Sequence, residues 1–360
     1  MAAVDPRLAE YARLLVERSL GVQPGWQVLI RSTPSARPLL EEVIRLIARK
    51  GAYPLLRMNW TLFPSDDVWA AEAPAELVAE MAPIDVYAAD HMDARITIEA
   101  PDNTRGAAQL TADRRALVRK AAAPFFSRTI KGEIPWVSCQ FPTNAYAQEA
   151  GMSLSRFEDF FYGAVLRDWD EESKSMYGLL AHFDAADEVR IVGAETDLTL
   201  SLRGRTGAVD DGHVNMPGGE FFFSPVEDSA EGTIFFDVPT ELDVSPVQGI
   251  RLTLRKGRVE EASAEHGEDV LLAALDMDEG ARFLGELGIG CNTGITQPMR
   301  NILYDEKMAG TVHLAVGASY PSVGGKNVSS LHWDLIKDLR GGGRIELDGE
   351  VVQENGAWKI

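Results

Sequence analysis

The chain has 360 residues, of which 45% are hydrophobic and 25% are charged, a composition typical of a globular protein. It carries 55 acidic and 35 basic side chains, and the net charge of -20 disfavours binding to nucleic-acid backbones and to anionic membrane surfaces. The two cysteines, Cys139 and Cys291, lie far apart in sequence. This spacing argues against a disulfide scaffold and against a cysteine-based zinc site.

The N-terminal segment lacks the basic stretch and apolar core of a signal peptide, and no apolar run approaches the length of a membrane span. We therefore expect a cytoplasmic protein that binds neither nucleic acid nor membranes. A chain of this length exceeds what one hydrophobic core organises, so two domains are expected.

The N-terminal half alternates between predicted strands and helices. Asp5 and Pro6 are typical of a helix start, and Gly21 is expected to close that first helical segment. Residues 26–32 have the pattern of a strand, and residues 36–51 that of a helix. Three further segments have the pattern of strands: 53–60, 84–90 and 94–100. This alternation predicts an α/β domain with a mainly parallel sheet. No glycine-rich phosphate-binding loop follows the first strand, which argues against a nucleotide site.

The sequence changes character near residue 185, where segments typical of antiparallel strands begin. Residues 187–204 have the pattern of a half-buried strand, and residues 249–265 that of a hairpin that turns at Lys256-Gly257. Residues 268–290 are expected to form a helix with a glycine-rich end, and residues 343–360 strands joined by Asp-Gly and Asn-Gly turns. The predicted domains are therefore an α/β domain in residues 1–184 and a β-rich α+β domain in residues 185–360.

Three glutamates of the C-terminal half lie among glycines and hydrophobic residues. Glu220 follows two glycines and precedes three phenylalanines, Glu286 lies in the segment LGELGIG, and Glu306 lies in LYDEKMAG. A carboxylate in such surroundings is costly to bury unless its charge is compensated. For any one of these glutamates, a helix cap or an ion pair would be enough to explain its position. Three such glutamates in one half of the chain indicate a shared cause.

His332 and Asp334 flank Trp333 in the segment LHWDLIKD. In a strand, residues two apart point to the same face, so the imidazole and the carboxylate are predicted to converge, with Trp333 packed on the opposite face. Taken alone, the pair is better explained as a buried histidine held by a neighbouring acid, because a short motif matches by chance too often. A second histidine, His313, precedes Tyr320 by seven residues.

Together, these acids and imidazoles indicate a bound cation. Carboxylates with a minority of imidazoles suit a pair of Zn²⁺, Mn²⁺ or Co²⁺ ions bridged by one carboxylate. Such a pair can hold a shared hydroxide at neutral pH and polarise a carbonyl, which is the chemistry of amide hydrolysis. The sequence has neither the HExxH motif of many zinc proteases nor a GxSxG nucleophile elbow.

Several ordered blocks of the chain resemble the M29 family of metallo-aminopeptidases, the aminopeptidase T group. The blocks are YARLLVERSLGVQPGWQVLI near the start and, in the C-terminal half, ETDLTLSLRGR, VNMPGGEFFFSPVEDSAEGTIFFD, GARFLGELGIG, NILYDEKMAGTVHLAVGASYP and SSLHWDLIKD. The resemblance implies an α/β domain followed by a β-rich domain, and a cytoplasmic homodimer. It also implies an aminopeptidase that releases single residues from peptides with a free N-terminus.

The same resemblance implies roles for individual residues. Two divalent metal ions per subunit, Zn, Co or Mn, are expected to be bound by Glu220, Glu286, Glu306, His313, His332 and Asp334. Catalytic roles are expected for Tyr320 and for Glu286, the latter as the carboxylate that bridges both ions. The segment between Tyr320 and His332 is short for the family, which is expected to affect substrate preference.

Two other functions stay open at this point. The 2,5-dihydroxypyridine dioxygenases are similar to this family and use a single iron, which His313, His332 and Asp334 would hold as a triad of two histidines and one carboxylate. That function leaves the three glutamates without a role. The other alternative is a non-catalytic, peptide-binding dimer, which predicts that metal ligands are lost, and none is lost here.

Overall fold

The computed structural model describes residues 5–60, 67–106, 110–242 and 245–360. The chain divides into two compact units, Met1–Leu166 with Gly212–Gly218 and Arg167–Asp211 with Gly219–Ile360. We call them the N-terminal unit and the C-terminal unit.

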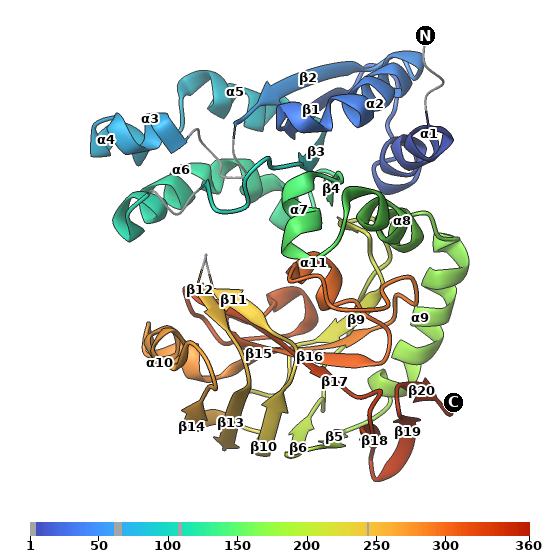
Figure 1. Cartoon of the computed structure of the whole chain (residues 1–360), viewed down its shortest axis with the longest axis vertical. Helices are drawn as coiled ribbons and strands as arrows, with labels where there is room; N and C mark the ends of the chain where they lie inside the picture. Colours follow the sequence, from blue (N-terminus) through green and yellow to red (C-terminus); the bar gives the residue numbers. More distant parts are fainter. Residues whose placement is uncertain (1–4, 61–66, 107–109, 243–244) are drawn as a thin grey trace. The chain divides into compact units, whose positions relative to one another are not determined.

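The N-terminal unit is built on a five-stranded sheet in which every pairing is parallel (Figure 1). The strand order is β2-β1-β3-β4-β8. The strands are β1 (Gln27–Ser32), β2 (Tyr53–Met58), β3 (Ala94–Glu99), β4 (Trp136–Gln140) and β8 (Asn215–Met216). The predicted α/β fold with a parallel sheet is therefore confirmed, and β8 adds a strand from much later in the sequence.

The first helix begins where the sequence predicts. In α1 (Pro6–Arg13), the side chain of Asp5 accepts a hydrogen bond from the backbone N–H of Arg7 at 2.9 Å. A π-helical segment continues to Ser19, and Gly21 then adopts a positive φ of 59°. The later helices described in this unit are α2 (Arg37–Arg49), α3 (Asp67–Glu72), α4 (Ala75–Val78), α5 (Pro83–His91), α6 (Ala112–Ile130), α7 (Asn144–Glu149) and α8 (Leu154–Val165).

One predicted strand of this unit is wrong. Residues 84–90 lie inside helix α5 and not in the sheet. Pro83 occupies the first turn of that helix, where its fixed φ suits the helix and its missing N–H has no partner to lose. Ile84 and Tyr87 are 68% and 60% exposed. Their apolar character, which suggested a buried strand, therefore does not mark a core-facing side.

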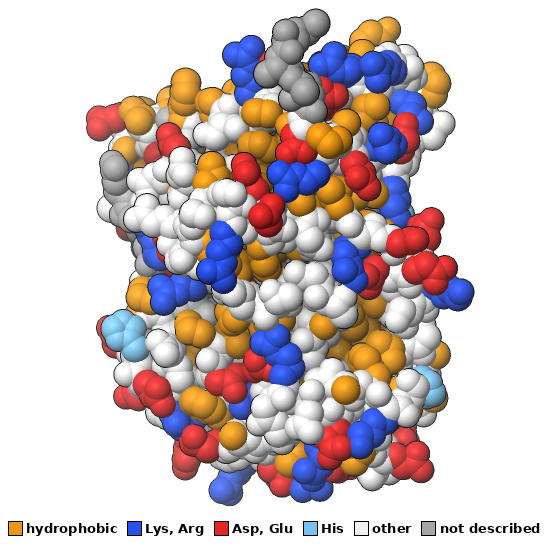
Figure 2. All heavy atoms as spheres, turned by 45° about the vertical axis from the view of Figure 1, so that its right-hand side comes forward, with side chains coloured by type: hydrophobic (Ala, Val, Ile, Leu, Met, Phe, Trp, Pro, Cys, Tyr) orange, Lys and Arg blue, Asp and Glu red, His pale blue; other side chains and the backbone are white. Residues whose placement is uncertain are grey.

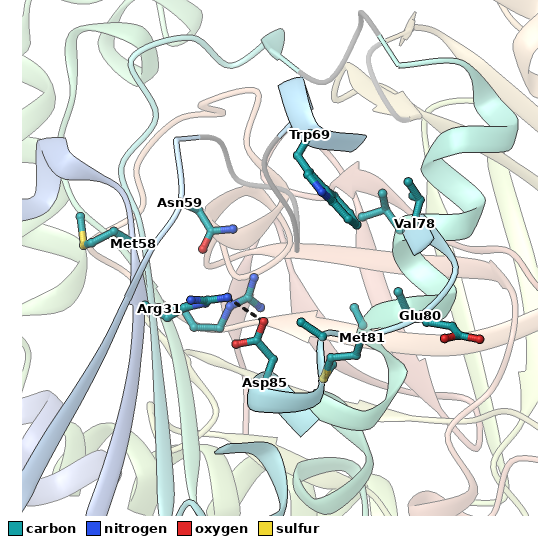
Figure 3. A pocket seen from close by; sticks show the side chains of 13 residues that line it. Arg31, Met58, Asn59, Trp69, Val78, Glu80, Met81 and Asp85 are labelled. Atoms are coloured by element: carbon teal, nitrogen blue, oxygen red, sulfur yellow. Dashed lines mark hydrogen bonds and ion pairs between the residues drawn. The ribbon is translucent and has the colours of Figure 1, made fainter. Parts of the chain in front are cut away.

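A cavity of about 460 Å³ lies in the N-terminal unit at the carboxyl ends of β1 and β2 (Figure 3). Arg31 of β1 and Arg57 of β2 are paired in register and both line it. Arg57 forms an ion pair with Asp85 at 2.7 Å, and Trp69 and Met81 contribute apolar walls. The predicted metal-site residues are not among the described residues that line this cavity.

The C-terminal unit contains two larger antiparallel sheets (Figure 1). The eight-stranded sheet, in the order β14-β13-β10-β6-β5-β18-β19-β20, consists of β5 (Glu188–Gly193), β6 (Thr196–Ser201), β10 (Glu231–Phe236), β13 (Ile250–Arg255), β14 (Arg258–Ser263), β18 (Arg344–Leu347), β19 (Glu350–Glu354) and β20 (Ala357–Trp358). The five-stranded sheet, in the order β17-β16-β15-β9-β7, consists of β7 (Ala208–Asp210), β9 (Glu220–Phe223), β15 (Leu284–Gly290), β16 (Thr311–Gly317) and β17 (His332–Asp338). The unit also contains the hairpin β11 (Thr240–Leu242) and β12 (Ser245–Val247) and the helices α9 (Trp169–Asp184), α10 (Glu268–Leu275) and α11 (Ile302–Asp305). The predicted β-rich fold is confirmed.

Two local predictions in this unit have opposite outcomes. The hairpin of β13 and β14 turns at Lys256 and Gly257, whose φ angles are 47° and 72°, as predicted. The predicted helix over residues 268–290 is wrong in its second half, because α10 ends at Leu275 and residues 284–290 form strand β15. The leucine and isoleucine side chains of β15 enter the core, and its glycines allow other groups to approach the opposite face closely.

The two larger sheets of the C-terminal unit share one hydrophobic core. Side chains from β5, β6, β10 and β13 belong to the same buried cluster as side chains from β15, β16 and β17. Burial of apolar surface, worth about 25 cal/mol per Å², is the main force that holds these sheets together. The five-stranded sheet is therefore anchored by one of its faces.

Charged side chains of both signs lie at the surface. On the face that Figure 2 shows, acidic and basic side chains are interspersed. None of the described helices is both long and apolar enough to cross a membrane.

Candidate metal centre

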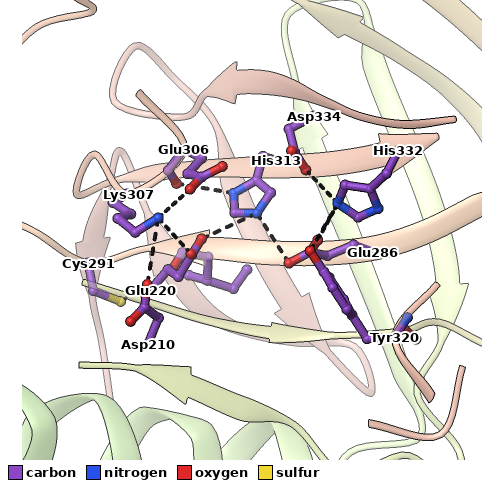
Figure 4. A network of polar contacts seen from close by, with 12 residues as sticks. Asp210, Glu220, Glu286, Cys291, Glu306, Lys307, His313, Tyr320, His332 and Asp334 are labelled. Carbon is purple, nitrogen blue, oxygen red and sulfur yellow. Dashed lines mark hydrogen bonds and ion pairs between the residues drawn. The ribbon is translucent and has the colours of Figure 1, made fainter. Parts of the chain in front are cut away.

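Five of the predicted metal ligands lie on one face of the five-stranded sheet (Figure 4). Because alternate residues of a strand point to opposite faces, the pairing register decides which side chains meet. The cross-strand pairs that define this face are Gly290–Glu220, Gly288–His313, Glu286–Ala315, Ala315–Asp334 and Gly317–His332. The register thus brings together side chains from β9, β15, β16 and β17, namely Glu220, Glu286, His313, His332 and Asp334.

The opposite face of the sheet is mainly apolar. Trp333 is 4% exposed and belongs to the hydrophobic core. Its Nε1–H donates a hydrogen bond to Thr240 Oγ1 at 3.2 Å. The prediction that His332 and Asp334 share a face with Trp333 behind them agrees with this arrangement.

Glycines of β15 make room for the polar face. A Cβ atom at Gly288 would lie 1.9 Å from His313 Nε2, so the imidazole lies directly over the glycine backbone. A Cβ atom at Gly290 would lie 2.1 Å from the carbonyl oxygen of Met308. The segment LGELGIG, predicted as the glycine-rich end of a helix, is therefore a strand whose polar face is closely covered.

Both histidines are held by backbone carbonyls through the ring nitrogen that faces away from the acids. His313 Nδ1 lies 3.1 Å from the carbonyl oxygen of Glu306, and His332 Nδ1 lies 2.8 Å from that of Ala318. When Nδ1 carries the proton and donates it to the carbonyl, the neutral ring presents the lone pair of Nε2 to the centre. Metal-binding histidines are commonly oriented in this way.

The Nε2 atoms of the two histidines converge on Glu286. His332 Nε2 lies 3.2 Å from Glu286 Oε2, and His313 Nε2 lies 3.6 Å from Glu286 Oε1. Glu220 Oε2 is 3.4 Å from His313 Nε2, and Asp334 Oδ1 is 3.7 Å from His332 Nε2. One possible ligand atom each from Glu286, His313 and Asp334 lies within 4.8 Å of the other two.

The electrostatics of the centre favour positive charge among the acids. Burial raises the pKa of Glu220 and of Asp334. Burial also opposes the ionisation of Glu286, but its contacts with the two histidines hold its pKa at about 2. Burial lowers the pKa of His313 and His332, yet the neighbouring acids outweigh it and raise these values to about 10 and about 9.

Tyr320 borders the centre. Its hydroxyl lies 3.2 Å from His332 Nε2, and its ring packs on Phe222 with 5.3 Å between the ring centroids. Its backbone N–H donates a hydrogen bond to Ser224 Oγ at 3.0 Å. Loss of water around the hydroxyl, together with the charge of Glu286, raises the pKa of Tyr320, so the phenol keeps its proton. Because 39% of the residue is exposed, it forms part of the accessible rim.

Glu306 joins the centre together with two residues that the sequence predictions missed, Lys307 and Asp210. Lys307 is fully buried, and its Nζ contacts Glu306 Oε1, lies 2.9 Å from Glu220 Oε1 and lies 3.8 Å from Asp210 Oδ2. Burial alone would lower the pKa of Lys307, but the charges of Glu220 and Glu306 raise it well above its ordinary value. Asp210 of β7 pairs in register with Glu220, which places it on the polar face. The position of Lys307 directly after Glu306 was a usable signal, whereas Asp210 had none.

The side chains of this centre fit divalent cations. The donors are carboxylate oxygens with two imidazoles, a set that suits zinc, manganese or cobalt. Glu220 Oε2 and Asp334 Oδ1 are buried and receive no hydrogen bond from the described residues. Because a buried carboxylate oxygen without a hydrogen bond is costly, a cation between these acids would stabilise them.

Fold and site together define a candidate metalloenzyme with its centre on a β-rich C-terminal unit. The chain matches the family described as Thermophilic metalloprotease (M29) over residues 4–358. It therefore belongs to the M29 family, and the expected class of metallo-aminopeptidase is confirmed at the level of the family.

Individual members of the family show how far the similarity extends. The chain is 27% identical to aminopeptidase AmpS of Bacillus subtilis, over 99% of this chain and 100% of that protein. It is 30% identical to aminopeptidase T of Thermus thermophilus, over 42% of this chain and 40% of that protein. The solved structure of wild-type AmpT from Thermus thermophilus superposes with a TM-score of 0.87 at 21% identity and covers 99% of this chain and 100% of that chain. This last likeness shows that the fold is the same.

Proposed function

We propose that this chain is a metal-dependent aminopeptidase that releases single residues from peptides with a free N-terminus. The observation that carries the proposal is the convergence of the two histidine Nε2 atoms on Glu286, between the buried carboxylates of Glu220 and Asp334. Membership of the M29 family supports it, because the relatives named above are aminopeptidases.

The proposed centre holds two divalent ions of zinc, cobalt or manganese. The residues proposed to bind them are Glu220, Glu286, Glu306, His313, His332 and Asp334. Glu286 is proposed to be shared between both ions, since it lies within 3.6 Å of both histidines. Bound there, the ions would polarise the scissile carbonyl and supply a shared hydroxide at neutral pH.

Tyr320 is proposed to donate a hydrogen bond to the carbonyl oxygen of the substrate as negative charge develops on it. Its protonated hydroxyl and its place at the accessible rim, 3.2 Å from His332 Nε2, support this role. The excess of acids in the centre is proposed to favour substrates with a free amine, because these carboxylates attract an ammonium group.

The test compares an unblocked peptide with its N-acetylated twin. Acetylation removes the basic amine but keeps the scissile bond, and a misplacement by about an ångström costs on the order of a hundred-fold in rate. We expect metal-loaded enzyme to release single N-terminal residues from the free peptide, as followed by mass spectrometry, and to leave the blocked peptide intact. Internal cleavage, or equal rates on both peptides, would contradict an aminopeptidase.

The two alternative functions receive less support from the centre. A mononuclear iron dioxygenase would use His313, His332 and Asp334. It would leave Glu220, Glu286 and Glu306 without a role. Oxygen consumption with 2,5-dihydroxypyridine would favour that function. Binding of peptides without any cleavage by the metal-loaded chain would favour the non-catalytic dimer.

The homodimer and the cytoplasmic location stay predictions. Light scattering on the purified chain measures its oligomeric state. Cell fractionation determines the compartment.

A further inference from the structure

Lys307 places a positive charge inside the proposed metal centre. The residue is fully buried, and its Nζ lies 2.9 Å from Glu220 Oε1 and contacts Glu306 Oε1 (Figure 4). Asp210 Oδ2 is 3.8 Å away. An ammonium group is buried at high cost unless acids pair with it, and here three carboxylates surround it.

The centre therefore has two ends of different character. At one end, Glu286 and Asp334 face the two histidines, with distances of 3.2–3.7 Å between their oxygens and the Nε2 atoms. At the other end, Asp210 and Glu306 face Lys307. Glu220 joins the two ends, because its Oε2 lies 3.4 Å from His313 Nε2 and its Oε1 contacts Lys307. We call them the histidine end and the lysine end.

The backbone fixes the position from which Lys307 reaches the acids. Its N–H donates a hydrogen bond to the carbonyl oxygen of Tyr304 at 3.0 Å, and its own carbonyl oxygen accepts one from the N–H of Asn292 at 2.8 Å. The backbone is held on both sides, so the ammonium group can leave the acids only by a rotation of its own flexible side chain.

We propose that Lys307 is a built-in cation that occupies the lysine end, so that the two proposed metal positions have unequal affinities. The first divalent ion binds at the histidine end, where no lysine competes for the donors. The second ion must share Glu220 and Glu306 with the ammonium group of Lys307 or displace it. It binds more weakly because the ion and the ammonium group, both positive, repel each other. This inference rests on the proposed function and adds the order in which the centre fills.

The test is a zinc titration of metal-free protein, with a chromophoric chelator as competitor. We expect the wild-type chain to bind one zinc ion tightly and a second at least about ten-fold more weakly. In Lys307→Gln the competing charge is gone, and the second ion is expected to bind at least about ten-fold more tightly than in wild type. Two equal positions in the wild-type chain, or an unchanged second affinity in the variant, would overturn the proposal.

Lys337 provides a matched control on the other face of the same sheet. It is also a buried lysine, 2% exposed, and it pairs with Asp237 at 2.6 Å. Lys337→Gln is expected to lower thermal stability and to leave both zinc affinities unchanged. A change in zinc binding as large as that of Lys307→Gln would show that any lost buried charge disturbs the centre, and would overturn the specific role of Lys307.

A second measurement covers the case in which Lys307→Gln folds poorly without metal. Removing the ammonium group leaves Asp210, Glu220 and Glu306 to repel one another, so zinc should raise the Tm of this variant more than that of the wild-type chain. An equal or smaller rise would contradict the proposal. Neither readout uses peptide cleavage. A chain that binds no zinc would refute the proposed function as well, whereas two equal positions would refute only the role of Lys307.

Discussion

The two faces of the five-stranded sheet have opposite chemistry, although the same strands build both. In β17, His332 and Asp334 lie on the polar face, and Trp333 and Leu335 between and after them enter the core. In β15, Glu286 lies on the polar face and Leu287 in the core. Of two neighbouring residues in these strands, one thus belongs to the candidate metal centre and the other to the hydrophobic core.

This difference shows how one sheet can separate stability from chemistry. The apolar face contributes stability through burial, and its loss leaves cavities. The polar face concentrates acids that are costly to bury and that a bound cation would stabilise. Substitutions on the polar face should therefore change metal binding and activity, and substitutions on the apolar face should change the free energy of unfolding.

Glu286→Ala should have the largest effect, because it removes the carboxylate between both histidines. We expect peptidase activity to fall by more than about a hundred-fold and the metal content per chain to fall as well, while the circular dichroism spectrum is preserved. Glu354→Ala is the control, since Glu354 lies at the surface and pairs with Lys359. Full activity with unchanged metal content in Glu286→Ala would contradict the assignment of this residue.

Tyr320→Phe should separate catalysis from metal binding at the rim of the polar face. The variant keeps the ring on Phe222 and loses the hydroxyl beside His332. Removing one donor to a developing oxyanion costs roughly a hundred- to a thousand-fold in kcat. We expect a loss of this size in kcat, measured by steady-state kinetics, with the metal content unchanged. If kcat changes little, Tyr320 only forms part of the wall.

Gly288→Ala should disturb the polar face through packing alone. The new Cβ would lie 1.9 Å from His313 Nε2, so the imidazole must move. A displaced ligand is expected to weaken zinc binding by about ten- to a hundred-fold, in the range seen when the groups that orient ligands are removed. Gly341→Ala is the control, because a Cβ there meets nothing within 4 Å. Unchanged zinc affinity in Gly288→Ala would show that His313 does not bind the ion from its position over β15.

The parts of this centre that depend on one strand could be predicted from the sequence. The two-residue period of a strand places His332 and Asp334 on the same face, and no other part of the chain is needed for that step. The strand around Glu286 was missed because glycine is rare in strands, and only the register with β16 shows that His313 fills the space over Gly288.

The charge balance of the centre could not be predicted from the sequence in the same way. Lys307 meets Asp210 and Glu220 only because the chain returns over the polar face after α11. The contact joins residues of separate elements, so the residue pattern of a single strand or helix does not predict it. The family resemblance pointed to acids and histidines, and the position of Lys307 next to Glu306 did not show that its side chain also meets Glu220 and Asp210.

Trp333→Phe should have the smallest effect on function, and it tests the apolar face directly. Phenylalanine keeps an aromatic ring in the core and loses part of the indole volume and the hydrogen bond to Thr240. The lost packing and hydrogen bond are expected to lower the free energy of unfolding by about 1–2 kcal/mol, measured by urea denaturation. Zinc affinity and kcat should stay within about two-fold of the wild-type values, because the indole lies on the face away from the proposed ligands.

Asp334→Asn is the matched variant, one residue further along the same strand. It keeps the volume of the side chain and removes a charge from the polar face, so it should weaken zinc binding and change the unfolding free energy little. Trp333→Phe is thus predicted to lower the free energy of unfolding and leave zinc binding unchanged, and Asp334→Asn is predicted to do the reverse. If Trp333→Phe weakens zinc binding as much as Asp334→Asn, the two faces are coupled through the strand. The packing of Trp333 in the core would then determine the positions of the proposed ligands on the polar face.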